Sequence, residues 1–155
     1  MLKNRFRSGN DRQITLQQSL ERERLLAKIA QLGIWEYEIA TETVSLDDRS
    51  CEIYGVNRAE FDGTTEAWIA LLHPEDRDAI TKRMRMFRDT TADALTITIR
   101  VLSPNLGERY ISLGAQMERD EHGRAQRMFG VVRDVTDEKM FEQRLQERAQ
   151  HMQAV

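Results

Sequence analysis

The residues best suited to catalysis or metal binding are few in this chain and lie far apart in its sequence. The 155 residues include three histidines and one cysteine. His73 precedes a proline, His122 stands in a polar turn, and His151 lies close to the C-terminal end. The sequence contains no His-Glu metal motif, phosphate-binding glycine loop or serine-nucleophile motif. We therefore predict that these residues are non-catalytic and hold no metal.

Composition and charge restrict the remaining classes of function. The single cysteine, Cys51, excludes an internal disulfide and suits a reducing compartment. A net charge of -3 argues against a nucleic-acid partner, which needs a concentrated basic face. No apolar run approaches the roughly 20 residues that cross a bilayer, and the N-terminus lacks the apolar stretch that a secretory signal requires. These features predict a cytoplasmic domain without membrane contact in this segment.

The first of three zones, residues 1–32, is predicted to be a helix or linker. "ITLQQSLERERLLAKIAQL" lacks Gly and Pro and is rich in helix-forming residues. Leu25, Ile29 and Leu32 follow at spacings of four and three, which places them on one stripe. Gly33 then ends the helical pattern.

The second zone begins with strand patterns and continues with helices. In "GIWEYEIAT" apolar residues alternate with polar ones, which predicts a half-buried strand, and "TVSLDD" suits a hairpin partner. "RSCEIYGV" and "TEAWIALLH" read as short helices. In the longer "HPEDRDAITKRMRMFRDT", Pro74 suits a first helical turn. Ile80, Met84 and Phe87 form the apolar stripe of that helix.

The third zone consists of three strands, "LTITIRV", "RYISLGAQM" and "AQRMFGVVRDV", separated by the turns "SPNLGE" and "DEHG". Two strands, several helices and three further strands predict an α+β fold. Its five-stranded antiparallel sheet should carry helices on one face. We expect the folded domain to span residues 33–136 and a further helix to span residues 137–155.

The last strand is apolar on both faces, although a strand covered on one side would alternate with polar residues. Phe129 and Val131, followed by Val135, are predicted to face away from the helices. The stripe of the N-terminal helix is the expected cover, either from the same chain or from a partner. This pattern predicts a homodimer through the N-terminal helix and the outer sheet face.

Four phrases, in this order, resemble the common bacterial subtype of the PAS domain with its C-terminal PAC segment. "LGIWEYEIATETVSLDD" resembles the opening hairpin, "EIYGV" the short helix after it, and "LLHPEDRDAI" the entrance to the long helix. "GERYISLGAQMERDEHGRAQRMFGVVRDVTDEK" is similar to the family consensus. The resemblance covers about residues 32–145. It implies a PAS fold flanked by signalling helices, and a sensory role in signal transduction.

The resemblance also implies that Asp134, Val135 and Thr136 join the last strand to an output helix. Thr136 suits the cap of that helix, because its hydroxyl can accept a free backbone N–H. Asp137 and Glu138 suit the first turn, where the helix dipole favours negative charge. Asp134 is expected to pair with a basic group that the sequence does not identify. The alternative is that these residues only begin a helix and do not transmit a signal.

The predicted output helix has a narrow apolar face. Phe141, Leu145 and Met152 follow a spacing of four and seven, which suits a two-helix coiled-coil seam. Family resemblance implies a downstream effector in the same parent chain. This effector would be a histidine kinase, or a cyclic-di-GMP cyclase or phosphodiesterase.

Cofactor binding is not predicted. Flavin-binding relatives carry a cysteine in an Asn-Cys-Arg phrase and a glutamine on the last strand. Here Cys51 lies in "RSCEIYG" and Val132 takes the glutamine's place. Haem-binding relatives need a histidine on the long helix, which has none after His73. A haem or flavin redox or gas sensor is therefore only an alternative.

The predicted interior leaves room for a small apolar or aromatic ligand, although a completely filled core is an equal expectation. A ligand would lie between the long helix and the inner sheet face. Six residues are the candidates for this pocket: Ile80, Met84, Phe87, Ile99, Leu113 and Val132. We accordingly predict a non-catalytic sensory domain, with a ligand-free dimerisation or protein-interaction module as the alternative.

Overall fold

The structure is a computed structural model that describes residues 5–154 of the chain. It divides into two compact units between Leu32 and Gly33. The first unit contains helix α1 (Arg5–Ile29), along which Leu25 and Ile29 expose their side chains. The predicted segments 1–32 and 137–155 include residues 1–4 and 155, which lie outside the described residues.

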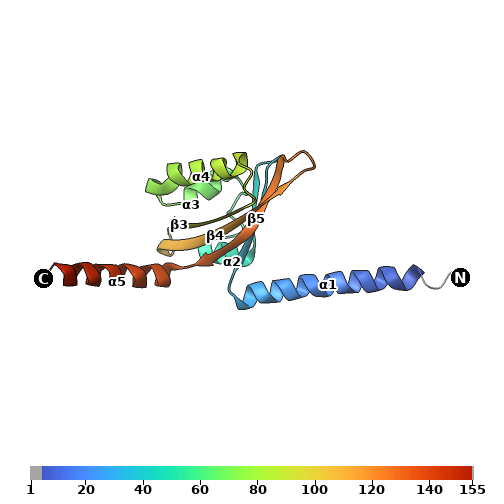
Figure 1. Ribbon diagram of the computed structural model, residues 1–155, viewed down its shortest axis with the longest axis horizontal. Helices are drawn as coiled ribbons and strands as arrows, with labels where there is room; N and C mark the ends of the chain where they lie inside the picture. The colour runs from blue at the N-terminus through green and yellow to red at the C-terminus, as the bar shows by residue number, and fades with distance from the viewer. Residues whose placement is uncertain (1–4, 155) are drawn as a thin grey trace. The chain divides into compact units, whose positions relative to one another are not determined.

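The second unit is built on one antiparallel sheet, which confirms the predicted α+β class. The sheet order is β2-β1-β5-β4-β3, so the first and last strands lie side by side at its centre (Figure 1). The elements are β1 (Gly33–Glu38), β2 (Thr43–Leu46), α2 (Asp48–Tyr54), α3 (Thr65–Leu71), the 3-10 turn η1 (Pro74–Asp76), α4 (Arg77–Asp89), β3 (Ala94–Ser103), β4 (Gly107–Arg119), β5 (Ala125–Asp134) and α5 (Thr136–Gln153).

The core lies between the inner face of the sheet and the helices. Alternate residues of all five strands are buried there, together with residues of α2 and with Phe87 of α4. The side chains of Ile80 and Met84 pack against this cluster, as the stripe in α4 predicts. The buried strand residues are Trp35, Val44, Leu46, Ile99, Val101, Ile111, Leu113, Ala115, Met117, Met128 and Val132.

Side-chain hydrogen bonds attach α2 to the sheet. Asp47 caps α2 by accepting the backbone N–H of Ser50 at 2.8 Å. The buried Ser50 hydroxyl donates to the carbonyl of Ile34, just before Trp35, at 2.9 Å. These bonds satisfy polar groups that would otherwise be costly to bury.

The entrance to α4 is attached to β3 by a bidentate ion pair. The guanidinium of Arg100 donates to both carboxylate oxygens of Asp76, each at 2.7 Å. This hydrogen bonding lowers the pKa of Asp76 below its ordinary value. Pro74 occupies the 3-10 turn immediately before α4, close to the predicted position. The helix that forms one wall of the interior is therefore fixed at its start.

Helix α5 leaves the end of β5 and has no buried residue (Figure 1). Phe141 and Leu145 expose 61% and 50% of their surface, and Met152 exposes 80%. An apolar row this exposed is suited to contact with another helix. Within residues 5–154, no helix combines the length and apolar character needed to span a membrane.

Candidate functional site

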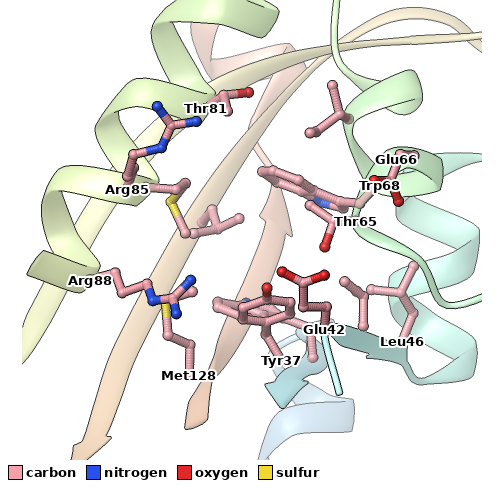
Figure 2. A pocket seen from close by; sticks show the side chains of 15 residues that line it. Tyr37, Glu42, Leu46, Thr65, Glu66, Trp68, Thr81, Arg85, Arg88 and Met128 are labelled. Atoms are coloured by element: carbon pink, nitrogen blue, oxygen red, sulfur yellow. The ribbon is translucent and has the colours of Figure 1, made fainter. Parts of the chain in front are cut away.

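A cavity of about 360 Å³ lies between the β1–β2 hairpin, α3, α4 and the inner face of β4 and β5. Its volume falls within the range of roughly 300–1,000 Å³ typical of small-molecule sites. Figure 2 shows side chains from these elements pointing into a common space. The lining residues are Trp35, Tyr37, Glu42, Val44, Leu46, Thr65, Glu66, Trp68, Ile69, Thr81, Met84, Arg85, Arg88, Leu113 and Met128.

The interior of the cavity is aromatic and apolar. Trp35 and Tyr37 point inward from β1 because they are two residues apart on the strand. Trp68 projects from α3, and its indole Nε1 donates to the hydroxyl of Tyr54 at 3.1 Å. Burial raises the pKa of Tyr54 to about 12, so this hydroxyl stays protonated at neutral pH. Trp68 is thus held in place by a neutral partner, and Met128 closes the wall from β5.

Two buried polar atoms in the lining have no hydrogen-bond partner among the described residues. They are the indole Nε1 of Trp35 and the hydroxyl Oγ1 of Thr65. Trp35 as a whole is only 6% exposed. Most buried polar atoms in proteins are paired, and leaving one unpaired costs about 1–3 kcal/mol. Both atoms are buried, so a ligand can pair with them only if neighbouring side chains move.

The rim of the cavity carries charges of both signs. Arg85 and Arg88 stand three residues apart on α4 and therefore on the same side of the helix. Glu42 approaches from the turn after β1, and Glu66 from α3. All four are exposed, and none forms an ion pair within the described part of the chain. The rim is therefore electrically balanced and its charged groups are available to a ligand.

Glu42 has an unusual backbone conformation for its type. Its φ of 52° lies in the left-handed region, and its N–H donates to the carbonyl of Ile39 across the turn. Residues other than glycine, asparagine and aspartate seldom adopt this conformation, and the cost is of order 1 kcal/mol. In Figure 2 the Glu42 carboxylate is directed toward the cavity.

The structure separates the six predicted pocket residues. Met84 and Leu113 line the cavity. The other four lie in the packed core, where Phe87, Ile99 and Val132 are buried and Ile80 is partly buried. The prediction missed the aromatic residues of β1 and α3. The alternation in "GIWEYEIAT" assigns Trp35 and Tyr37 to one face, but it does not indicate that the hairpin leaves a gap there.

Cys51 lies in α2 and is absent from the cavity lining. Burial is the main cause that raises the pKa of its thiol. A buried thiol of this kind is a small apolar residue, as the sequence indicated.

The strand-to-helix junction is organised by the carboxylate of Asp134. One of its oxygens, Oδ2, pairs with the guanidinium Nη1 of Arg109 at 2.9 Å. The other, Oδ1, accepts the backbone N–H of Thr136 at 2.9 Å and its hydroxyl at 2.6 Å. Arg109 on β4 is therefore the basic partner that the sequence left unidentified. Asp134 connects β4, β5 and the first residue of α5.

The predicted capping role of Thr136 is wrong. The cap residue of α5 is Val135, which has no capping side chain. The Thr136 hydroxyl is occupied elsewhere, because it donates to Asp134 and accepts the backbone N–H of Tyr110 at 3.1 Å. Tyr110 also accepts the N–H of Val135 and, through its hydroxyl, a bond from Gln143 in α5 at 3.2 Å. The first turn of α5 is thus attached to β4.

Two of the residues predicted for the outer sheet face lie there. Val131 is 37% exposed and Phe129 is partly buried, with the neighbouring Ile34 39% exposed. Val135 differs from the prediction: β5 ends at Asp134, and Val135 is buried at the junction. In the first unit, Leu32 is partly buried.

An antiparallel five-stranded sheet, helices over a ligand-sized cavity and an exposed exit helix define a small sensory domain. The chain matches the model of the PAS fold over residues 43–132 and belongs to the PAS family. Relatives include the sensor protein FixL of Bradyrhizobium diazoefficiens, which is 21% identical over 80% of this chain, and the probable diguanylate cyclase DgcE of Escherichia coli, which is 28% identical over 83%. The matches span 24% and 11% of those two proteins.

Solved structures share the fold. A sensory box histidine kinase/response regulator from Burkholderia thailandensis superposes with a TM-score of 0.73 at 24% identity, covering 86% of this chain and 99% of that chain. The N-terminal domain of a diguanylate cyclase with PAS/PAC sensor from Marinobacter aquaeolei gives a TM-score of 0.63 at 17% identity, with coverage of 70% and 98%.

Proposed function

We propose that this chain is a non-catalytic regulatory domain of a cytoplasmic bacterial signalling protein. It converts a ligand or conformational change in the cavity into a change in α5. The proposal needs no bound haem or flavin, since the cavity itself offers space for a small molecule. The single observation that carries it is that the same two strands line the cavity and hold the exit helix.

The route runs along β4 and β5. Leu113 and Met128 line the cavity, and Leu113 pairs with Val132 across the two strands. Further along the same strands, Tyr110 and Asp134 form the hydrogen bonds that hold α5. A ligand that displaces the cavity wall therefore changes the strain on the junction. The ligand can shift the equilibrium between two positions of α5 only by the difference between its binding free energies for the two states.

The effector is proposed to lie in the same parent chain. FixL is named a sensor protein and DgcE a probable diguanylate cyclase, and this chain corresponds to a minor part of each. A histidine kinase or an enzyme of cyclic-di-GMP metabolism is therefore the effector class that these relatives support.

We propose further that the domain works as a homodimer. The exposed apolar residues of α1, α5 and the outer sheet face support this, because each is a surface that a second copy can cover. A ligand-free dimerisation module is the second candidate, and these same exposed residues favour it. The cavity supports the sensory role over that alternative.

The junction provides the test. In the full-length protein, Asp134→Ala should change effector output by about fivefold or more, because α5 loses its link to Arg109. The same change should cost the isolated chain only about 1–2 kcal/mol of unfolding free energy, measured by urea denaturation.

Arg127→Ala is the matched control. Arg127 also lies on β5, but it pairs with Glu36 and Glu118 of the neighbouring strands and not with α5, so its removal should leave output nearly unchanged. Normal regulation by a correctly folded Asp134→Ala protein would contradict the proposed role of the junction.

A further inference from the structure

We infer that the cavity binds a small aromatic amino acid, or a close analogue that carries both a carboxylate and an ammonium group. The aromatic ring would occupy the interior, and the two charged groups would meet the rim. This inference rests on the proposed sensory function and specifies the ligand class of the same site.

The interior selects for an aromatic body. The rings of Trp35, Tyr37 and Trp68 and the thioethers of Met84 and Met128 form walls suited to stacking and sulfur–aromatic contact (Figure 2).

The rim selects for a ligand that carries both charges. Arg85 and Arg88 form no ion pair in the described chain and present donors that suit a carboxylate. Glu42 and Glu66 also form none and suit an ammonium group. An anion alone would leave the glutamates unmatched, and a cation alone would leave the arginines unmatched.

The orientation of two rim side chains, Arg88 and Glu42, agrees with this assignment. Figure 2 shows the guanidinium of Arg88 extending from α4 toward Tyr37, while the Glu42 carboxylate reaches into the same space from the hairpin side. Opposite charges on opposite sides of the opening match the separated charges of an amino acid. The left-handed backbone of Glu42 holds a carboxylate at a turn where other residue types would be less strained.

The chain provides its own optical reporter of binding. It contains two tryptophans, Trp35 and Trp68, and both line the cavity. A ligand in the cavity should therefore change the fluorescence of every tryptophan in the protein. Calorimetry on the same samples gives an independent dissociation constant.

Four ligands that share a 4-hydroxyphenyl ring but differ in their charged groups separate the contributions of the two charges. L-tyrosine carries both charges, 3-(4-hydroxyphenyl)propionate keeps only the carboxylate, tyramine keeps only the ammonium, and p-cresol keeps neither. We expect tyrosine to bind at least about tenfold more tightly than each of the other three.

Substitutions assign each charge to its partner. Arg88→Gln should weaken tyrosine binding about tenfold and remove the advantage of tyrosine over tyramine. Glu42→Gln should remove the advantage of tyrosine over 3-(4-hydroxyphenyl)propionate. Arg83→Gln on α4 and Glu60→Gln, both exposed and outside the cavity lining, should leave binding unchanged.

Equal binding of p-cresol and tyrosine, tighter binding of either singly charged analogue, or no binding of any member to the folded protein would overturn the inference. These outcomes are distinguishable from failure of the proposed function. Tyrosine binding that leaves hydrogen exchange in α5 unchanged would contradict signalling but not the ligand class. Regulation through Asp134 with no binding in the series would contradict the ligand class alone.

Discussion

At the scale of single residues, the cavity wall depends on one neutral hydroxyl. Tyr54 is 1% exposed and accepts the indole N–H of Trp68, which faces the cavity. Ionising this phenol would place a negative charge in the core without a cationic partner, which is strongly unfavourable. Burial therefore links the protonation of Tyr54 to the stability of the domain.

The stability of the domain should fall at alkaline pH because of Tyr54. Folding raises the pKa of this group from 10 to about 12, so the protonated form is favoured in the folded state. Its stabilising effect is complete below pH 10 and is lost as the pH rises toward 12. The loss should approach about 2–3 kcal/mol, measured by urea unfolding across this range.

Tyr54→Phe is the matching control. It retains most of the packing but has no proton to lose, so the unfolding free energy of the variant should depend less steeply on alkaline pH. If wild type and variant show the same pH slope, Tyr54 does not cause the alkaline loss. The variant should also be less stable at neutral pH, because the Trp68 N–H loses its acceptor.

At the scale of elements, β4 and β5 each carry a glycine where they pair, Gly114 and Gly130. A Cβ at Gly130 would stand 1.8 Å from the carbonyl oxygen of Gly114, which is backbone and cannot move aside. A Cβ at Gly114 would meet the Val131 side chain at 3.5 Å, an ordinary contact. Two glycines on neighbouring strands therefore have different steric requirements.

Gly130→Ala should destabilise the domain by about 3 kcal/mol or more, because the two strands must separate. Gly114→Ala should change the unfolding free energy by no more than about 1 kcal/mol. Chemical denaturation of both variants makes the comparison. Equal stability of the two variants would show that the close contact between Gly130 and the Gly114 carbonyl does not exclude a side chain at position 130.

The sequence predicted these elements well because their patterns are local. Strand alternation in "LTITIRV" and helical spacing in "DAITKRMRMF" each depend on neighbours a few residues apart, and the structure contains β3 and α4 there. The order of the strands within the sheet was not predicted, because local patterns do not show which strands pair.

The site was less predictable because it depends on contacts between distant segments. The pairing of Asp134 with Arg109 joins two strands, and no periodicity identifies it. The same holds for Thr136, whose residue type indicated a cap although its hydroxyl bonds to Tyr110 and Asp134. The cavity arises where the hairpin, α3 and α4 fail to fill the space between them. This is a property of three-dimensional packing rather than of any one segment.

At the scale of the whole molecule, the exposed apolar residues should be covered by self-association. The wild-type chain is expected to be a dimer at micromolar concentration in native mass spectrometry. Replacing Leu25 and Ile29 together by glutamate should shift it to the monomer, because the stripe on α1 loses its apolar surface.

Arg24→Glu is the control for this experiment, since it adds negative charge to α1 and leaves the apolar stripe intact. It should remain dimeric. A wild-type mass equal to one chain at this concentration would contradict the proposed homodimer. It would leave the ligand proposal untouched, because the cavity lies within one copy.

The position of β5 has a consequence for how the protein is made. β5 is the last strand to leave the ribosome, yet it is the central strand that joins the β1–β2 hairpin to the β3–β4 hairpin. Each hairpin must wait, with one edge unpaired, until residue 134 has been synthesised. Nearly the whole domain is therefore translated before its sheet can close, and nascent chains that stall earlier expose edges on which chaperones or other nascent chains can act.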